Sequence, residues 1–310
     1  MAAPDPDSIG IGSFAATFGE LECQPGNIPG FAELWREVLP GTEFATMGCG
    51  TFRKMAKPIG GYVADCVERV LAGQGLAAAD VDRLVVATSD ACLARLGRDL
   101  AVDVMSSVGL TRCVPASLSF QQCCSSLEAL RYGWELFADP DVHNVVLVAL
   151  DFTPDDTERV KSFALFGDAV AGCLISRQPA PGSLSLLGSA LTVDYAGLVG
   201  TDSFGSRQQA AQAALDKVFG EAGEKLPNVM KVFGPNLYRP VALFNAMAAG
   251  VPKPQLHFGE PMQRYGHCGN ADWIINLMDY AGQHGLAAGE LYLAHATAPG
   301  FFACGLLRGQ

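Results

Sequence analysis

The stretch Ser119-Phe-Gln-Gln-Cys-Cys-Ser-Ser-Leu-Glu-Ala-Leu130 places two adjacent cysteines between an apolar segment and a helical pattern. Residues 114–120 are strand-like, and Leu127 and Leu130 begin a run of apolar residues at helical spacing. A thiol at such a strand-to-helix turn lies at the positive end of a helix, which favours the thiolate. A thiolate is the nucleophile that thioester chemistry needs. The stretch therefore predicts a reactive cysteine in an α/β fold.

The composition indicates a well-filled core and argues against one class of partner. The chain has 310 residues, of which 49% are hydrophobic and 17% charged, and its mean hydropathy is +0.22. This length suits one large α/β domain or two fused halves, and so few charges favour an oligomer that buries apolar surface. The net charge of −11 argues against nucleic acid, which needs a concentrated basic face.

Cysteine usage and hydropathy favour a cytoplasmic protein. The ten cysteines come without a secretory signal in residues 1–7, so we expect them to be reduced and mostly buried. No apolar run reaches the length of a membrane span, and we therefore expect no membrane partner. No Cys-x-x-Cys pair or His/Cys spacing suggests a metal site.

Buried strands alternate with helices in the first half of the chain, which is the pattern of βαβ units. Strands are predicted at 9–16, 82–88, 114–120 and 142–150. Helices are predicted at 58–73, 100–108 and 124–138.

The second half repeats this scheme. Strands are predicted at 169–176 and 184–193, as a hairpin, and at 229–233, 255–258, 291–296 and 301–307. Helices are predicted at 207–219, 241–249 and 272–284. Because residues 176–185 are rich in turn formers, we expect an internal boundary there, with two similar halves packed face to face, residues 1–178 and 179–310.

Four motifs occur in an order that is found in one enzyme superfamily. Residues 81–88 resemble the strand that follows its first long helix, and Gln121–Leu127 is similar to its Ala-Ala-Cys-Ala-Gly-Phe, with Cys123 on the nucleophile. Residues 166–171, Phe-Gly-Asp-Ala-Val-Ala, are similar to Phe-Gly-Asp-Gly-Ala-Gly-Ala, and residues 298–301 lie where a Gly-Gly-Gly-Phe loop is expected. Over nearly the whole chain, the sequence resembles the thiolase superfamily and most closely its β-ketoacyl-acyl-carrier-protein synthase III branch.

The resemblance implies an α/β fold of duplicated βαβαβαββ halves in a five-layered α-β-α-β-α sandwich. Residues 1–178 would carry the nucleophile, and residues 179–310 the His and Asn. It also implies an acyltransferase that takes an acyl group from an acyl-CoA or acyl carrier protein thioester, through an acyl-Cys123 intermediate, to a small-molecule acceptor. No permanently bound cofactor is implied, and a homodimer is expected.

The sequence departs from the synthase III pattern at two places. That branch pairs its Cys with a His in Pro-His-Gln-Ala-Asn and an Asn in Gly-Asn-Thr. Residues 233–239 here read Phe-Gly-Pro-Asn-Leu-Tyr-Arg, without a His. Residues 265–270 read Tyr-Gly-His-Cys-Gly-Asn, with His267 at the Asn position, as in thiolases and elongating ketosynthases.

The resemblance therefore implies a catalytic set of Cys123 as nucleophile, His267 as base and oxyanion donor, and Asn236 as oxyanion or water ligand. Pro235 is the alternative counterpart at the position of Asn236. The backbone N–H groups of Gly300 and Cys123 would bind the tetrahedral oxyanion, where preorganised donors are most effective.

The missing His bears on the reaction type. Decarboxylative condensation needs two groups that polarise the malonyl thioester carbonyl, whereas a Cys-His dyad suffices for acyl transfer to a bound nucleophile. Our first hypothesis is a ketosynthase III-like acyltransferase of specialised, polyketide-type biosynthesis that forms a C–C bond. The alternatives are ester or amide formation without decarboxylation, and a silent partner subunit of a heteromeric synthase. Acyl length, acceptor, and CoA against carrier protein stay open.

Further residues have more local interpretations. Cys124 is expected in the core, and Asp168 is expected to brace a turn. His295 is expected to be a core or near-site histidine, within reach of the pocket. The resemblance implies a substrate entrance at Arg53, Lys54 and Arg239.

Overall fold

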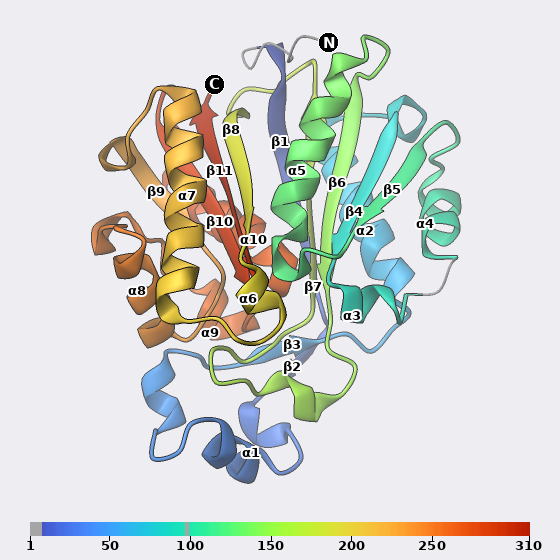
Figure 1. The fold of residues 1–310 in the computed structure, drawn as a ribbon. Coiled ribbons are helices and arrows are strands. Elements are labelled where there is room, and N and C mark those ends of the chain that lie inside the picture. The colour runs from blue at the N-terminus through green and yellow to red at the C-terminus, as the bar shows by residue number, and fades with distance from the viewer. Residues whose placement is uncertain (1–7, 97–98) are drawn as a thin grey trace.

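The computed structural model describes residues 8–96 and 99–310, and it shows a mixed α/β molecule around one extended sheet (Figure 1). Residues 1–7, on which the expectation of no secretory signal rests, lie outside the described residues. Helices cover both outer faces of the sheet and also lie between its two halves. The predicted α-β-α-β-α sandwich is therefore confirmed.

Five strands build the first half of the sheet. Their order across the sheet is β5 (Val114–Leu118), β4 (Arg83–Thr88), β6 (Asn144–Asp151), β7 (Ala169–Ser176) and β1 (Gly10–Phe18). Strands β5, β4 and β6 are parallel, whereas β7 is antiparallel to both β6 and β1. Strands β4, β6 and β7 are buried along nearly their whole length, which explains their continuous apolar sequences.

Four strands build the second half. They follow in the order β8 (Leu184–Val193), β11 (Phe301–Gly309), β10 (Leu291–Ala298) and β9 (Val229–Phe233). A single pairing of Ile11 with Leu184 joins β8 to β1 and so connects the two halves. The strands thus fall into two groups, and the division between residues 178 and 179 stays a prediction.

Two strand predictions in the second half are wrong. The predicted hairpin of 169–176 and 184–193 does not form, because β1 lies between β7 and β8 and pairs with both. The predicted strand 255–258 is reduced to one bridge between Val232 and Leu256. Pro252 and Pro254 precede that bridge, and a proline has no N–H to donate to a ladder.

The helices form three layers. Helices α5 (Ser125–Glu135) and α10 (Asp272–His284) lie between the two half-sheets and contact strands of both. Helix α2 (Ile59–Gln74) covers the outer face of the first half-sheet, and α7 (Phe204–Ala222) covers that of the second (Figure 1). The shorter elements are β2 (Leu21–Cys23), β3 (Phe52–Lys54), α1 (Phe31–Val38), α3 (Asp90–Leu93), α4 (Leu100–Val108), α6 (Tyr195–Leu198), α8 (Arg239–Ala248) and α9 (Pro261–Tyr265).

The central helix layer holds the sandwich together. Because α5 and α10 are covered on both sides, Leu127, Leu130 and Trp273 are almost completely buried. The indole N–H of Trp273 on α10 donates to the Ser126 hydroxyl on α5 at 2.9 Å. This bond satisfies two polar groups inside an apolar layer and sets how the two helices lie against each other. The N-terminal ends of both helices are thereby brought together at the site described below.

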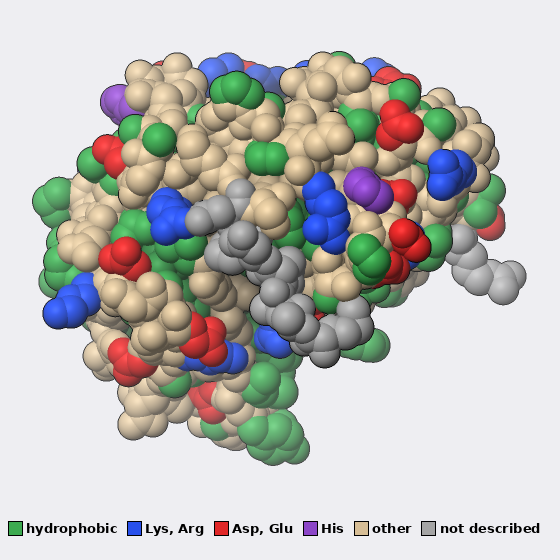
Figure 2. Space-filling view, turned by 90° about the horizontal axis from the view of Figure 1, so that it is seen from above, with side chains coloured by type: hydrophobic (Ala, Val, Ile, Leu, Met, Phe, Trp, Pro, Cys, Tyr) green, Lys and Arg blue, Asp and Glu red, His purple; other side chains and the backbone are tan. Residues whose placement is uncertain are grey.

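The outside of the molecule carries mixed charges. On the face seen in Figure 2, Lys and Arg side chains are separated by acidic and apolar side chains, and they form no continuous basic surface on the described part of that face. Within residues 8–96 and 99–310, no helix combines the length and hydrophobicity that a membrane span requires.

A buried ion pair braces the loops below the sheet. Arg159 is fully buried, and its guanidinium donates to Asp168 at 2.7 and 3.0 Å. The Asp168 carboxylate also accepts from the backbone N–H groups of Met55 and Thr153, both at 2.9 Å. These bonds join three segments of the chain, in agreement with the interpretation of Asp168 as a bracing residue.

We predict that Asp168→Ala lowers the free energy of unfolding by about 3–5 kcal/mol, because the buried guanidinium of Arg159 loses its buried carboxylate partner and keeps only Asp156 at the rim. Urea unfolding followed by circular dichroism measures this change. The matched control is Glu260→Ala, which removes the exposed pair of Glu260 and Arg264 and should cost less than about 1 kcal/mol. Equal losses in the two variants would contradict a bracing role for the buried pair.

Candidate active site

The cysteine turn is held in a strained conformation between β5 and α5. Gln122 has a φ of 54°, which is unusual for a residue other than glycine, and Cys123 follows it in a short 3-10 turn. Asn270 holds this turn from both sides. Its amide N–H donates to the Gln122 carbonyl at 2.9 Å, and its amide oxygen accepts from the Ser126 N–H at 2.8 Å. The position of Cys123 therefore depends on a residue from the second half of the chain.

Asn270 is itself held by a buried carboxylate at the end of β6. Asp151 accepts from the backbone N–H of Asn270 at 2.7 Å and from its side-chain N–H at 2.8 Å, and it also accepts from the Ser89 N–H at 2.9 Å. Burial raises the pKa of Asp151, and these donors act in the opposite direction. Sequence reasoning missed both residues, although the carboxylate at a strand end and the asparagine three residues after His267 were available signals.

The structure brings His267 to Cys123. The Cys123 Sγ lies 3.8 Å from the Nε2 of His267, and the opposite ring nitrogen, Nδ1, is hydrogen-bonded to the Asp272 carboxylate. His267 is 2% exposed, and its ring packs edge-on against Phe166 with the centroids 4.8 Å apart. The three side chains form a Cys-His-Asp relay, in which the carboxylate orients the imidazole and can stabilise its protonated form.

Sequence reasoning missed Asp272. It is the first residue of α10, five residues after His267, and it is 1% exposed. Its carboxylate accepts from the backbone N–H of Cys268 at 2.8 Å and from that of Asn236 at 2.7 Å. An acidic residue at the start of a predicted helix is expected on grounds of helix stability alone, so this residue did not stand out.

The structure places Asn236 beside Asp272. The Asn236 Nδ2 donates to Asp272 at 3.1 Å, and its amide oxygen accepts from the Asn276 Nδ2 at 2.9 Å. These bonds support a positioning role, in which Asn236 and Asn276 hold the carboxylate that orients His267. The predicted role of Asn236 as an oxyanion or water ligand stays a prediction.

Gly300 lies in the turn between β10 and β11 with a φ of 76°. A Cβ atom on the neighbouring Gly197 would lie 2.5 Å from the Gly300 nitrogen, so two glycines permit this turn to pack closely. Ala298 and Pro299 of the same turn line the cavity that Cys123 lines. The pairing of the Gly300 and Cys123 N–H groups as an oxyanion hole stays a prediction.

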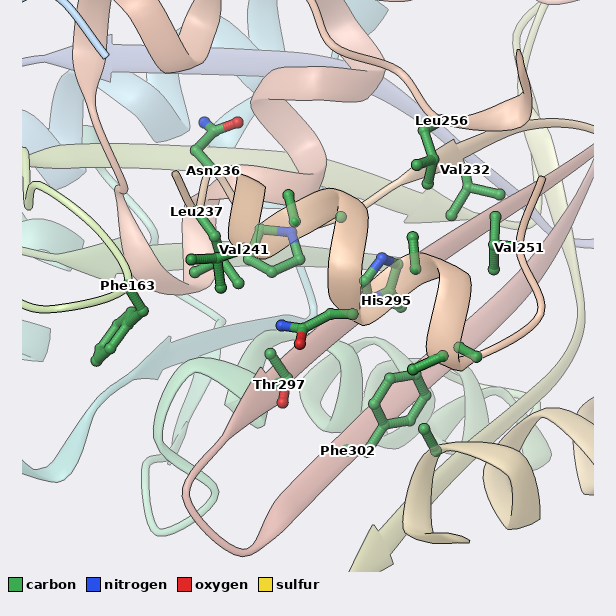
Figure 3. A pocket seen from close by; sticks show the side chains of 18 of the residues that line it. Phe163, Val232, Asn236, Leu237, Val241, Val251, Leu256, His295, Thr297 and Phe302 are labelled. Carbon is green, nitrogen blue, oxygen red and sulfur yellow. The ribbon is translucent and has the colours of Figure 1, made fainter. Parts of the chain in front are cut away.

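A cavity of about 370 Å³ lies beside Cys123 and His267, which is within the size range of small-molecule sites. It is bounded by α7, α8, the loop after β9 and one face of β10. Figure 3 shows Phe163, Asn236 and Leu237 toward one side, Val232, Val251 and Leu256 toward the other, and His295 between the two groups. The cavity is thus mainly apolar, with the relay at its edge.

Solved structures share this architecture. The acyltransferase ChlB3 aligns with a TM-score of 0.80 at 16% identity, covering 97% of each chain. The 3-oxoacyl-[acyl-carrier-protein] synthase III of Aquifex aeolicus aligns with a TM-score of 0.77 at 16% identity, covering 97% of this chain and 99% of that one. AbyA1, a tetronic acid condensing enzyme, aligns at 0.73 and 17% identity, covering 97% and 100%. This chain has the ketosynthase III fold.

No protein-family model matches the sequence, and the comparison with curated proteins finds no match. The resemblance inferred from four motifs is confirmed at the level of the fold by the solved structures. At identities of 16–17%, likeness to the ketosynthase III structures carries the architecture, whereas the chemistry must be argued from the residues of this chain.

The basic residues of the predicted substrate entrance do not line the cavity of this ketosynthase III fold. Arg53 pairs with Glu22, Lys54 pairs with Asp156 at 2.6 Å, and Arg239 stacks over the Phe258 ring. Among the described residues, the cation that lines the cavity is Arg207, which pairs with Asp202 at 3.0 Å. The entrance role of the first three residues stays a prediction.

The surroundings of Cys123 disfavour a thiolate. Burial, together with the negative charges of Asp151 and Asp272, raises its pKa well above the ordinary value. The expectation of a resting thiolate at a helix end is therefore wrong, because α5 begins two residues later and desolvation of the charge outweighs the helix dipole. The thiol must pass its proton to His267 as it attacks.

Two other candidates are resolved by their surroundings. Cys124 is completely buried and points into the core, where burial raises the pKa of its thiol to about 12. It is thus not poised for reaction. His295 faces the cavity.

Among residues 8–96 and 99–310, no group of His, Cys, Asp and Glu side chains is arranged to hold a metal ion.

We predict that Asp272→Asn slows acylation of Cys123 by about 10²–10⁴-fold, because His267 loses the carboxylate that orients it and stabilises its charge. Mass spectrometry of the intact protein during incubation with an acyl thioester measures the rate. Asp103→Asn on the outer helix α4 is the matched control and should change the rate by less than about twofold, since Asp103 is exposed and exposed substitutions have small effects. A rate for Asp272→Asn that equals the control rate would remove Asp272 from the relay.

A second prediction concerns pH. Because the pKa of Cys123 is raised, little thiolate is present near neutral pH, and the alkylation rate should rise about tenfold per pH unit until it reaches that pKa. Peptide mass spectrometry after brief iodoacetamide treatment measures the rate, with glutathione as the reference thiol, which levels off near an ordinary thiol pKa of about 8.5. A plateau for Cys123 below that of glutathione would show a stabilised thiolate and contradict the neutral resting state.

Proposed function

We propose that this protein is an acyltransferase that binds an acyl group as a thioester on Cys123 and passes it to a hydroxyl or amine of a small-molecule acceptor. One observation carries the proposal, namely the relay of Cys123, His267 and Asp272 at the edge of an apolar cavity. The donor would be an acyl-CoA or an acyl carrier protein. The ketosynthase III fold adds support, because ChlB3 is described as an acyltransferase.

The first half-reaction loads the enzyme. His267 takes the thiol proton of Cys123 through Nε2 while the sulfur attacks the thioester carbonyl carbon. The bond between that carbon and the donor sulfur then breaks, and the departing thiolate takes the proton back from His267. Asp272 stabilises the positive imidazolium while it exists.

The second half-reaction runs the same relay in reverse order. His267 removes a proton from the acceptor hydroxyl or amine, whose oxygen or nitrogen attacks the acyl carbon. The bond to the Cys123 sulfur breaks, and the sulfur regains its proton from His267. One general base thus serves both half-reactions, and no other co-reactant is needed.

The loop after β9 supports this reaction over decarboxylative condensation. At the position where the synthase III pattern has its His, this chain has Asn236, or Pro235 in the alternative alignment, so no imidazole faces a malonyl carbonyl from this loop. The Asn236 amide is used for Asp272 and Asn276. A single imidazole next to the thiol suits acyl transfer to a bound nucleophile, which benefits from proximity.

C–C bond formation in a polyketide-type pathway is the second candidate. Its support is that AbyA1, which shares the fold, is described as a condensing enzyme. A silent partner subunit has less support, because nucleophile and base lie within 3.8 Å of each other.

The proposal also covers the oligomeric state, the acyl donor and the location of the protein. We propose a homodimer, supported by the exposed Val114 on the outermost strand β5. A CoA donor fits the overall charge of −11 better than an acidic carrier protein does. A cytoplasmic location stays a prediction.

The test is acylation followed by transfer. We expect incubation with acyl-CoA to add one acyl mass to the wild-type protein and none to Cys123→Ala. Added hydroxyl or amine compounds should then discharge the adduct. With malonyl-CoA present, we expect no release of carbon dioxide.

The other outcomes are equally clear. Malonyl-dependent carbon dioxide release from the wild type, absent in Cys123→Ala, would establish condensation instead. No adduct from any CoA or carrier-protein thioester would favour the silent subunit. Cys124→Ala is the matched control. The Cys124 thiol lies in the core next to Cys123, and its removal should leave acylation of Cys123 intact.

A further inference from the structure

The cavity continues past the relay into the outer helix layer. Along β10, Ala294 and Ala296 face the central helices, whereas Leu293, His295 and Thr297 face the other way, toward α7 and α8. The part of the cavity on that side, called the inner chamber here, is lined by Leu215, Val232, Ala246, Val251, Leu256 and His295. Elsewhere side chains fill this layer, so a specific set of residues must leave the chamber empty.

Small residues create the chamber. Helix α8 presents Ala242 and Ala246 toward it, one turn apart, and Ala249 follows at the end of the helix. Any larger side chain at these positions would fill the space between α8 and the sheet. Met247, by contrast, is 71% exposed on the opposite face of the same helix. The chamber therefore exists because one face of α8 carries small side chains.

His295 is the polar group of the chamber. Its Nδ1 is buried without a hydrogen-bond partner among the described residues, and its ring stacks on Phe302 with centroids 5.7 Å apart. A Cβ atom at Gly234 would lie 2.4 Å from His295 Nε2, so only glycine there leaves room for the imidazole. Burial lowers the pKa of His295 to about 4, so the ring is neutral near pH 7. A neutral imidazole can exchange hydrogen bonds with an uncharged hydroxyl or carbonyl group.

We propose that the inner chamber binds the acyl chain of the thioester donor and selects medium-length chains that carry an uncharged hydroxyl or oxo group, which hydrogen-bonds to His295. This inference rests on the proposed acyl-Cys123 function and names the substrate class of that site. The acyl chain would occupy a mainly apolar space that belongs to the same cavity as Cys123.

The acyl chain fits the chamber better than the acceptor does. An acceptor must bring a nucleophilic hydroxyl or amine and any further polar groups, and each of these loses water on entry. Toward the inner chamber, most of the lining side chains are aliphatic or aromatic, with His295 and its neighbour on β10, Thr297, as polar groups. Polar lining residues such as Asp202, Arg207 and Asn245 lie on α7, α8 and the segment before α7. The acceptor would therefore use that more polar part of the cavity.

The experiment measures acylation of Cys123 by a series of N-acetylcysteamine thioesters, which need no carrier protein. The probes are the acetyl, butanoyl, hexanoyl, octanoyl and 3-hydroxyoctanoyl thioesters, and intact-mass spectrometry gives each rate. In the wild type, kcat/KM for acylation should rise about fourfold per methylene that enters the chamber. The 3-hydroxyoctanoyl thioester should react faster than the octanoyl one.

Two variants test the chamber itself. Ala246→Leu fills it from α8 and should slow octanoyl transfer to the enzyme by at least about tenfold, while acetyl transfer changes by less than about twofold. Met247→Leu on the exposed face of α8 is the matched control and should behave as wild type. Retained acetylation also shows that the Ala246→Leu variant is folded. Val251→Phe fills the same space from another side of the chamber.

A third variant tests the polar contact. His295→Leu should reduce the preference for the 3-hydroxyoctanoyl over the octanoyl thioester by about fivefold, the value of one hydrogen bond. His295→Gln should restore part of this preference. A merely structural role for His295 would lower both rates equally and leave their ratio unchanged, which would overturn the assigned contact.

The outcomes separate the two proposals. If no thioester acylates the wild type, the proposed function fails and the inference fails with it. If all chains react equally, or if Ala246→Leu slows all chains equally, the inference alone is overturned. If Ala246→Leu leaves acylation unchanged but slows discharge of the acyl-enzyme by an added alcohol, the chamber holds the acceptor and the inference is wrong.

Discussion

The site depends on one buried carboxylate at the first turn of α10. Asp272 is paired with His267 and accepts from the backbone N–H groups of Cys268 and Asn236. A buried carboxylate is costly unless donors satisfy it, so the loop after β9 and the loop before α10 must both close on this group. The imidazole can then present only Nε2 to Cys123. The closure of these two loops and the orientation of the base therefore depend on the same carboxylate.

A second buried carboxylate does the same for the nucleophile. Asp151, at the end of β6 in the first half, holds Asn270 of the second half, and Asn270 holds the turn on both sides of Cys123. The two halves thus support each other, because Asp151 of the first half holds Asn270 of the second, and Asn270 in turn holds the Cys123 turn of the first. This exchange explains why the thiol and its base meet at the N-terminal ends of the two central helices.

Most of the architecture could be predicted, since long apolar strands and amphipathic helices leave a strong periodic pattern. The hairpin prediction failed because adjacency along the chain does not reveal that β1 lies between β7 and β8. Of the site, Cys123 and His267 could be named from motifs. Asp272 and Asn270 were missed. Asp272 was hidden in an ordinary helix-start pattern, and the role of Asn270 lies in its bonds to residues that are distant in the sequence.

The amino-acid sequence by itself determined the alternation of strands and helices, the cysteine turn and the presence of His267, since these are local patterns of side-chain type. Only the tertiary structure decided the protonation of the thiol, the relay through Asp272 and the chamber behind His295. Each of these depends on how much water is excluded and on which buried groups meet. Solvent exclusion and long-range hydrogen bonding arise only when the layers pack together.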